Sequence, residues 1–366
     1  MNARIALVLV VLLVVLGGGA LVYRYQENAQ RPENVAALGR PLLKDVPAAK
    51  IATIRVSEPK ATLTIKQQGD GWVIAERRGF PADLAKVREF VLKLIELKVG
   101  QSEPIGDKDR ARLNLDEPGK KSETAGTQVE LDAADGKPLA KLIVGKKYFK
   151  REVENPDKAP ADGRFVALPG EEGTVYIISD PLAQASAKSA DWIDRTSFQV
   201  EKVQSLEVRL ADGDRWRLER AADNADWKLA GLKAGEKLDS GRVNAATYSL
   251  SMLELADVAP DDAKETGLDK PALIDASTFD GLEYSIKVGR PEGDNYYVRF
   301  NSSGSLPAES NPASSGPDAE RIKKLRERAP REKLLQNYVL LMQKSKFEDT
   351  LKPRAELLEK KPDAKK

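Results

Sequence analysis

The sequence predicts an α+β protein built from two tandem repeats of a mostly antiparallel β-β-β-α-β-β-β unit, with one N-terminal transmembrane helix and a helical C-terminal tail. Three observations lead to this prediction: an apolar run at the N-terminus, a series of landmarks that occurs twice in the same order, and an alternation of apolar and polar residues in the early strands. At 366 residues, the chain is long enough for two domains with sizeable cores.

The first predicted element is a membrane anchor within residues 1–25. Ile5 to Val22 is a run of eighteen uncharged residues, preceded by Arg4. At about 1.5 Å per residue, such a helix nearly spans a hydrocarbon core of about 30 Å. Because Arg4 favours a cytoplasmic N-terminus, we expect a single-pass protein of the inner (cytoplasmic) membrane with its bulk on the periplasmic side. The alternative is a cleaved signal peptide. A linker at 26–49 follows.

The two predicted repeats span residues 50–178 and 198–300. Each contains a tryptophan after a turn, an amphipathic helix, the motif Leu-Asp-x-Pro, a hairpin turn with Asp-Gly, and a strand that ends in Val-Gly plus a basic residue. These landmarks lie at Trp72, 115–118, 135–136 and 144–146 in the first repeat, and at Trp227, 268–271, 280–281 and 288–290 in the second. A series of motifs in the same order indicates an internal repeat.

Residue spacing predicts the elements of each repeat. Leu63 and Ile65 alternate with polar neighbours, which is typical of a strand with one face in water. Side chains three or four residues apart give each helix an apolar face, namely Leu84, Val87, Val91, Leu94 and Leu97 in the first repeat and Val243, Thr247, Leu250 and Leu253 in the second. Asp239 or Ser240 is placed to cap the second helix. We expect Trp72 and Trp227 to be core anchors, because they occupy equivalent strand positions.

Three segments lie outside the repeats. Residues 179–197 are predicted to form an inter-domain helix, 301–317 a Ser/Pro-rich flexible linker, and 318–366 a charged helical tail broken near Pro330 and Pro353. Within the tail, the stretch from Arg321 to Lys333 has seven basic residues against two acids. This stretch is either a solvated helix face or a site for anionic lipid or an acidic partner.

The composition excludes several classes of site. The chain has no Cys and no His, which removes thiol nucleophiles, the Ser-His-Asp triad and the usual zinc sites. Lys plus Arg number 59 and Asp plus Glu 57, so a net charge of +2 gives no overall field to attract nucleic acid. The S-x-x-K pattern that begins at Ser57 falls at a predicted hairpin turn and lacks its partner motifs. We therefore expect no catalytic residue, no cofactor, no metal and no nucleic-acid partner.

One basic patch is a candidate partner-binding site. It interleaves bases with aromatic residues at the start of an insertion that the second repeat lacks, and consists of Lys146, Lys147, Tyr148, Phe149, Lys150 and Arg151. Such a patch suits an anionic headgroup, a polysaccharide or a protein partner. The alternative is a solvated edge with its aromatic rings folded under the loop.

The order of the landmarks resembles the bacterial family catalogued as domain of unknown function 4340. The similarity covers about Lys50 to Phe300 and is closest from 268–271 through 288–290 to 295–298. Members of this family are membrane-tethered and are often encoded beside auxiliary components of gliding-motility-type ABC transporters. The resemblance therefore implies an accessory or scaffold role at the envelope, and it supplies no catalytic residues.

These observations lead to one main hypothesis of function. The protein is expected to be a non-enzymatic, membrane-anchored envelope protein that acts as an accessory or scaffold component of an ABC-transporter-type complex. Two alternatives remain open: an extracytoplasmic hydrolase of envelope polymers that uses carboxylates, and a ligand-sensing module.

Overall fold

The computed structural model of the chain describes residues 38–119, 123–307 and 317–360. The segment predicted to cross the membrane lies outside these residues. Within them, no helix combines the length and the apolar character needed to span a bilayer. The described chain divides into two compact units. The first comprises the chain up to Gln67 together with Ala85–Ala187, and the second comprises Gln68–Leu84 together with the chain from Lys188 onward.

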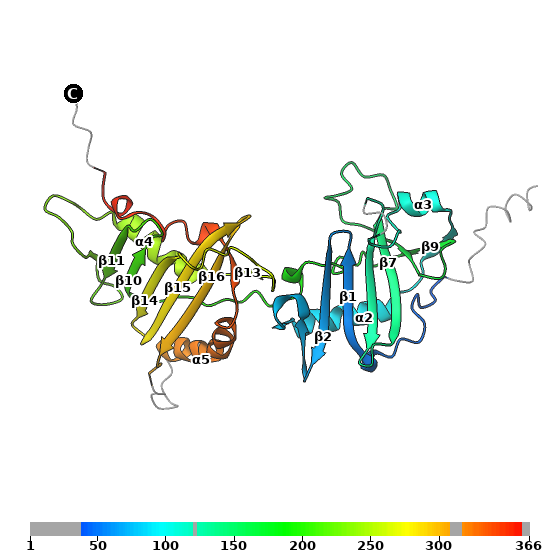
Figure 1. Ribbon diagram of the computed structural model, residues 1–366, viewed down its shortest axis with the longest axis horizontal. Helices are drawn as coiled ribbons and strands as arrows, with labels where there is room; N and C mark the ends of the chain where they lie inside the picture. Colours follow the sequence, from blue (N-terminus) through cyan, green and yellow to red (C-terminus); the bar gives the residue numbers. More distant parts are fainter. Residues whose placement is uncertain (1–37, 120–122, 308–316, 361–366) are drawn as a thin grey trace, which may run out of the picture. The chain divides into compact units, whose positions relative to one another are not determined.

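Among the described residues, nine strands form the first sheet, in the order β4-β3-β2-β1-β6-β7-β8-β9-β5 (Figure 1). Strand β1 pairs antiparallel with both β2 and β6. The bounds are β1 Ile51–Glu58, β2 Ala61–Gln68, β3 Gly71–Ile74, β4 Phe80–Pro81, β5 Gln101–Pro104, β6 Thr127–Ala133, β7 Pro138–Tyr148, β8 Gly163–Ala167 and β9 Thr174–Ile178.

Helix α2 (Leu84–Glu96) contributes to the core of the first unit, and the short helix α3 (Asp107–Arg112) follows β5. The helix buries Val87, Phe90 and Leu94. The predicted face included the first and last of these but not Phe90. The strand alternation is confirmed only in part: Leu63 is 1% exposed and Ile65 is fully buried, but Thr64 between them is also buried, at 9% exposure. Burial of this apolar surface is the main force that holds helix and sheet together.

The second sheet has eight strands within the described chain, in the order β12-β11-β10-β14-β15-β16-β17-β13. Its strands are β10 Val203–Arg209, β11 Arg215–Glu219, β12 Lys228–Leu229, β13 Leu255–Val258, β14 Ala272–Thr278, β15 Leu282–Glu292, β16 Asn295–Gly304 and β17 Leu340–Gln343. Helix α4 (Ser240–Tyr248) continues into the 3₁₀ turn η5 (Ser249–Met252), and α5 (Pro317–Leu335) precedes β17. As predicted, Asp239 caps α4, accepting a hydrogen bond from the Arg242 N–H at 3.1 Å.

The two sheets follow the same strand order. Without the two-residue β4, the first reads β3-β2-β1-β6-β7-β8-β9-β5, and each strand has a counterpart at the same place in the second sheet. Both sheets also shift register at corresponding places: at Ile51/Thr53 in β1 and Val203/Ser205 in β10, and at Val144/Lys147 in β7 and Val288/Pro291 in β15.

The register shifts in β7 and β15 explain the Val-Gly landmark. A Cβ atom on Gly145 would lie 2.5 Å from the Leu113 carbonyl oxygen, and one on Gly289 would lie 2.2 Å from the Thr266 carbonyl oxygen. In both units, the N–H of the residue after the glycine donates to that same carbonyl at 2.9 Å. The motif therefore marks a close backbone crossing that only glycine can occupy without displacing its neighbours.

The predicted order of elements within each repeat is incomplete. Five strands follow each helix, rather than three, because β5 and β9 in the first unit and β13 and β17 in the second are additional. Each of these four strands has only four or five residues. Strands this short give too few alternating positions for a periodicity to be recognised.

The predicted inter-domain helix is wrong. In residues 179–197, the structure contains only the 3₁₀ turn η4 (Ser189–Asp191). Pro181 disfavours helix for the residue before it, and Leu182 adopts a positive φ of 44°. The apolar residues that suggested a helix are instead buried at the end of this turn and directly after it, with Trp192 1% exposed and Ile193 fully buried.

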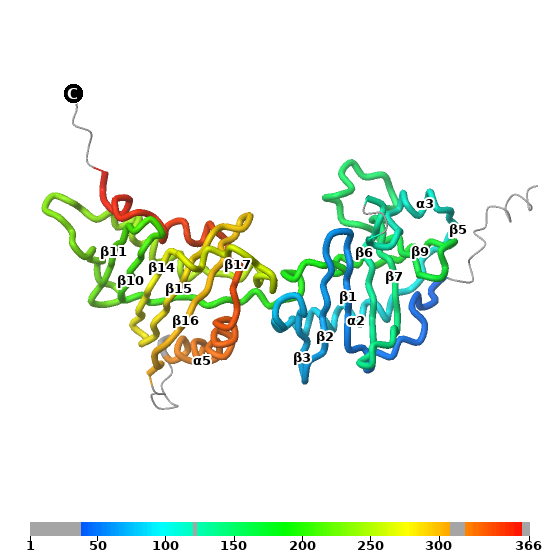
Figure 2. The backbone as a smooth tube through the Cα atoms, in the orientation of Figure 1, coloured from blue at the N-terminus to red at the C-terminus, as the bar shows by residue number. Residues whose placement is uncertain are grey.

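The predicted tail and the predicted end of the second repeat at residue 300 are also wrong. Helix α5 continues through Pro330, and the chain then returns to add β17 beside β16 (Figure 2). The second unit therefore includes most of the segment expected to be a separate tail. Of the predicted linker, residues 301–304 belong to β16, whereas 308–316 lie outside the described residues.

Candidate functional site

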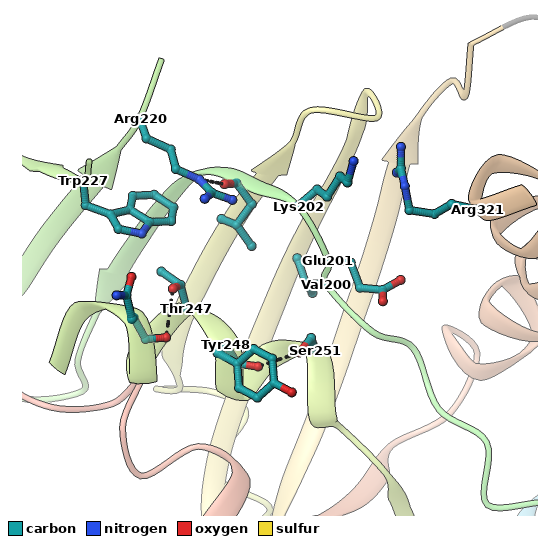
Figure 3. Close-up of a pocket in the computed structure, with 11 residues that line it drawn as sticks. Val200, Glu201, Lys202, Arg220, Trp227, Thr247, Tyr248, Ser251 and Arg321 are labelled. Carbon is teal, nitrogen blue, oxygen red and sulfur yellow. Dashed lines mark hydrogen bonds between the residues drawn. The ribbon is translucent and has the colours of Figure 1, made fainter. Parts of the chain in front are cut away.

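The second unit contains an open pocket of about 510 Å³ (Figure 3). Its wall is formed by the residues before β10, the end of β11, helix α4 and the start of α5. Lys202 lies directly before β10, Arg220 directly after β11, and Trp227 directly before β12. Tyr248 ends helix α4, and Arg321 belongs to α5. Elements far apart in sequence thus contribute to one concave surface.

Arg220 and Trp227 form a stacked pair in this wall. The Arg220 guanidinium lies over the Trp227 ring, 4.6 Å from its centroid, in a cation–π arrangement. Its Nε donates to the Val203 carbonyl oxygen at 2.7 Å, and its Nη2 donates to Asp223 Oδ1 at 2.7 Å. Because three groups hold the guanidinium, it supports the ring and is not free to bind a ligand.

Trp227 and Trp72 are not core anchors, contrary to the prediction. Both are only half-buried, whereas the buried tryptophans are Trp192 at 1% exposure and Trp216 at 3%. Trp227 precedes β12, which has only two residues and lies at the end of the second sheet. A ring at the end of a sheet has neighbours on fewer sides, so it remains accessible.

The charged groups of this pocket are all engaged. The Lys202 ammonium lies 3.8 Å from Asp223, and Arg321 forms an ion pair with the buried carboxylate of Asp280. Glu201, the only acidic residue that lines the pocket, lies 3.6 Å from Arg328. Recognition at this site therefore depends on aromatic faces and neutral polar groups.

Exposed apolar side chains continue the surface beyond the pocket. Tyr248 is 67% exposed and Met252, at the end of η5, is 46% exposed. Trp, Tyr, Met and Arg are the residue types enriched in the centres of protein–protein interfaces. The four residues Arg220, Trp227, Tyr248 and Met252 are referred to below as the aromatic face. Its composition is that of a docking surface for another polypeptide.

The candidate residues chosen from the sequence lie in the first unit, and three of them organise the loop that follows β7. The Lys147 ammonium donates to the carbonyl oxygens of Pro156 at 3.1 Å, Asp157 at 2.8 Å and Ala159 at 3.1 Å. The Tyr148 ring packs edge-on against Phe165, with centroids 5.5 Å apart. The Lys150 N–H donates to Asp162 Oδ2 at 2.9 Å.

The structure brings half of that candidate patch together. Lys146, Lys147 and Phe149 line a second pocket of about 520 Å³, while Tyr148, Lys150 and Arg151 do not. Asn114, Thr127 and Arg164 line the same pocket but were not predicted from the sequence, because no motif marks them. The aromatic face was not predicted from the sequence either, although the recurrence of a tryptophan in both repeats was a usable signal.

The basic stretch of the tail binds its own unit. Arg328 Nη2 donates to the Gln199 carbonyl oxygen at 2.9 Å, and Arg331 Nη2 donates to the Asp194 carbonyl oxygen at 2.6 Å. Arg328 also pairs with the buried Glu332 at 2.8 Å, and burial raises the pKa of that carboxyl. Arg328 and Arg331 therefore hold α5 against the rest of the second unit. These two arginines belong neither to a freely solvated helix face nor to a lipid-binding site.

Comparison with known proteins gives one finding. The family described as Domain of unknown function (DUF4340) matches residues 72–271 of the 366. No curated protein and no solved structure matches the chain.

Proposed function

The chain belongs to the DUF4340 family of domains of unknown function, and from this premise we propose that it is a non-enzymatic accessory or scaffold protein that binds a protein partner through the aromatic face. The single observation that carries the proposal is the exposure of Tyr248, which lines the same pocket as the Arg220–Trp227 stack, and of Met252 at the end of the adjoining turn η5. Leaving such side chains in water is unfavourable unless a partner covers them.

The engaged charges support a binding role over a catalytic one. Glu201, which lines the pocket, is held by Arg328, and Asp223 and Asp280 are held by the pocket residues Lys202 and Arg321. A general acid or base needs a free position from which to exchange a proton with a substrate. The sequence also contains neither His nor Cys to take that role.

We further infer that the two units are copies of one domain. The shared strand order, the shared register shifts and the paired glycine crossings support this inference. A scaffold with two related domains can offer two different surfaces.

We propose that the run from Ile5 to Val22 anchors the protein in the inner membrane, with both units outside the cytoplasm. The partner on this view is a membrane protein, in an ABC-transporter-type complex.

The proposal is tested by crosslinking the full-length protein in intact membranes and identifying what is recovered with it. We expect a defined membrane protein. Replacing both Tyr248 and Met252 by Ala should reduce its recovery about tenfold or more, the effect of losing interface residues worth upwards of 1.4 kcal/mol.

The matched control is Leu92→Ala, because Leu92 is 55% exposed on helix α2 of the first unit. It removes a similar apolar side chain from a different surface and should leave recovery unchanged. Recovery of lipid alone, or equal loss with both changes, would contradict the proposed function.

A further inference from the structure

The second pocket, in the first unit, is lined by more basic than acidic side chains. It lies where β7 and β8 shift register, between the glycine crossing at Gly145 and the loop that follows β7. Lys146, Lys147 and Arg164 contribute the positive charge. None of the three forms an ion pair with a described carboxylate.

Lys147 is a fixed charge and not a free donor. All three hydrogens of its ammonium are used by the three loop carbonyls at 2.8–3.1 Å. Carbonyl oxygens bind the ammonium without neutralising it. An anion in the pocket would therefore feel the charge of Lys147 at no cost in ordering its side chain.

Arg164 and Lys146 supply the free donors. Arg164 Nε donates to the Pro181 carbonyl oxygen at 2.9 Å, which fixes the guanidinium, while no partner for its two Nη atoms occurs among the described residues. Burial lowers the pKa of Arg164, as expected where desolvation is not offset by an acid. Lys146 is exposed, and its ammonium group likewise has no partner among the described residues. Within the described chain, the Thr127 hydroxyl and the Asn114 amide are also unused.

The corresponding pocket positions in the second unit show that this charge is not needed by the fold. Lys147 pairs in register with Arg164, and the corresponding pair in the second sheet is Pro291 with Tyr296. Lys146 corresponds to Arg290, which Glu265 neutralises at 3.0 Å. The same framework thus forms without free cations at this place.

Two acids limit what the pocket can take. Glu58 and Asp157 also line it, and Glu58 Oε1 accepts the Ala187 N–H at 3.1 Å. The excess of positive charge is therefore small, which disfavours polyanions and suits one oxyanion group. A planar guanidinium with two free nitrogens matches two oxygens of a phosphate. The remaining volume, beside Phe149 and Pro156, accommodates an organic substituent.

We propose that this pocket binds a phosphate group carried by a small ligand or by a lipid headgroup, with Arg164 and Lys146 as its hydrogen-bond donors and Lys147 as a fixed charge. This inference is independent of the aromatic face, because it concerns the other unit and another class of ligand.

The test uses the full-length protein in a neutral detergent, titrated calorimetrically with glycerol 3-phosphate and, separately, with a short-chain phosphatidylglycerol. Saturable binding of the first probe identifies a soluble phosphate ligand, and binding of the second alone identifies a lipid headgroup. Glycerol at the same ionic strength, set with sodium chloride, should give no saturable heat.

Variants make the test specific. Arg164→Gln should weaken binding about tenfold or more, and Lys146→Gln should weaken it to a smaller extent. Lys150→Gln is the control, because Lys150 belongs to the same loop but does not line the pocket. Lys146 is exposed, so its variant remains informative if Arg164→Gln fails to fold. No saturable binding of either probe, or equal weakening by Lys146→Gln and Lys150→Gln, would overturn the proposal.

Discussion

The two units share a strand order but place their accessible chemistry at different points. In the first unit, the register shift after Gly145 leads into a charged pocket. In the second, the same shift is closed by the Arg290–Glu265 ion pair, and the accessible groups lie around Tyr248 at the end of α4. The close backbone crossings leave no freedom at the glycines. The comparison shows that the glycine crossings of the backbone are the same in both units, whereas the side chains around the register shift differ.

The largest expected difference between the units concerns their aromatic residues. Phe198 is fully buried in the second unit and stacks on Phe300, with centroids 3.8 Å apart. Phe198→Ala should lower the free energy of unfolding by about 3–5 kcal/mol. Phe165 of the first unit is only half-buried against Tyr148, so Phe165→Ala should cost clearly less.

Urea denaturation followed by tryptophan fluorescence reports mainly on the second unit, because Trp192, Trp216 and Trp227 lie in its chain after Lys188, whereas Trp72 lies in β3 of the first sheet. Tryptophan fluorescence therefore reports on the Phe198 variant, and hydrogen exchange of the first unit reports on the Phe165 variant. Equal costs in the two units would contradict the assignment of Phe198 to a packed core.

The glycine crossings provide the next largest effect. Gly145→Ala and Gly289→Ala should each reduce the free energy of unfolding by about 1–3 kcal/mol, because the added Cβ meets a carbonyl oxygen in both. Gly106→Ala is the matched control, since nothing lies within 4 Å of its Cβ position and its φ is −96°. Hydrogen exchange in each unit measures the local cost. If the variants at 145 and 289 are as mild as the control, the shared crossing is not a constraint.

Much of the fold could be predicted because its signals are local. The Val-Gly landmark, the two Asp-Gly turns and the cap at Asp239 each depend on a few adjacent residues. The strands β13 and β17 could not be predicted, since they pair with each other from positions far apart in the sequence. The pockets could not be predicted either. Lys146 and Lys147 are adjacent residues of the same type. Only the fold shows that three carbonyl oxygens bind the Lys147 ammonium, whereas the Lys146 ammonium has no partner among the described residues.

The helix cap gives a smaller effect that is specific to the second unit. Asp239→Ala should cost about 1 kcal/mol, because the Arg242 N–H loses its acceptor. Tryptophan fluorescence during urea denaturation measures the change. Asp239→Asn should restore most of the stability, since Asn is also a good N-cap residue. A loss with Asn as large as with Ala would show that the cap is not the cause.

The smallest effect is a dependence on pH. A hydrogen bond from Arg354 is the main cause that lowers the pKa of Glu236 from 4.5 to about 2. A carboxyl with a lowered folded-state pKa stabilises the fold above pH 4.5, and this contribution is lost as the pH falls toward 2. The urea midpoint of the second unit should therefore fall less steeply in Glu236→Gln between pH 5 and pH 2. If the urea midpoint depends on pH in the same way in the unchanged protein and in Glu236→Gln, the Glu236–Arg354 ion pair does not contribute to stability.

Site-specific photo-crosslinking in intact membranes tests the central claim most directly. A photoreactive phenylalanine analogue is placed at residue 248 of the second unit and, in a separate protein, at residue 92 of the first. These are the exposed positions on α4 and α2. The account predicts a crosslink to one defined membrane protein from residue 248 and none from residue 92. No protein crosslink from residue 248, or the same adduct from both positions, would contradict it.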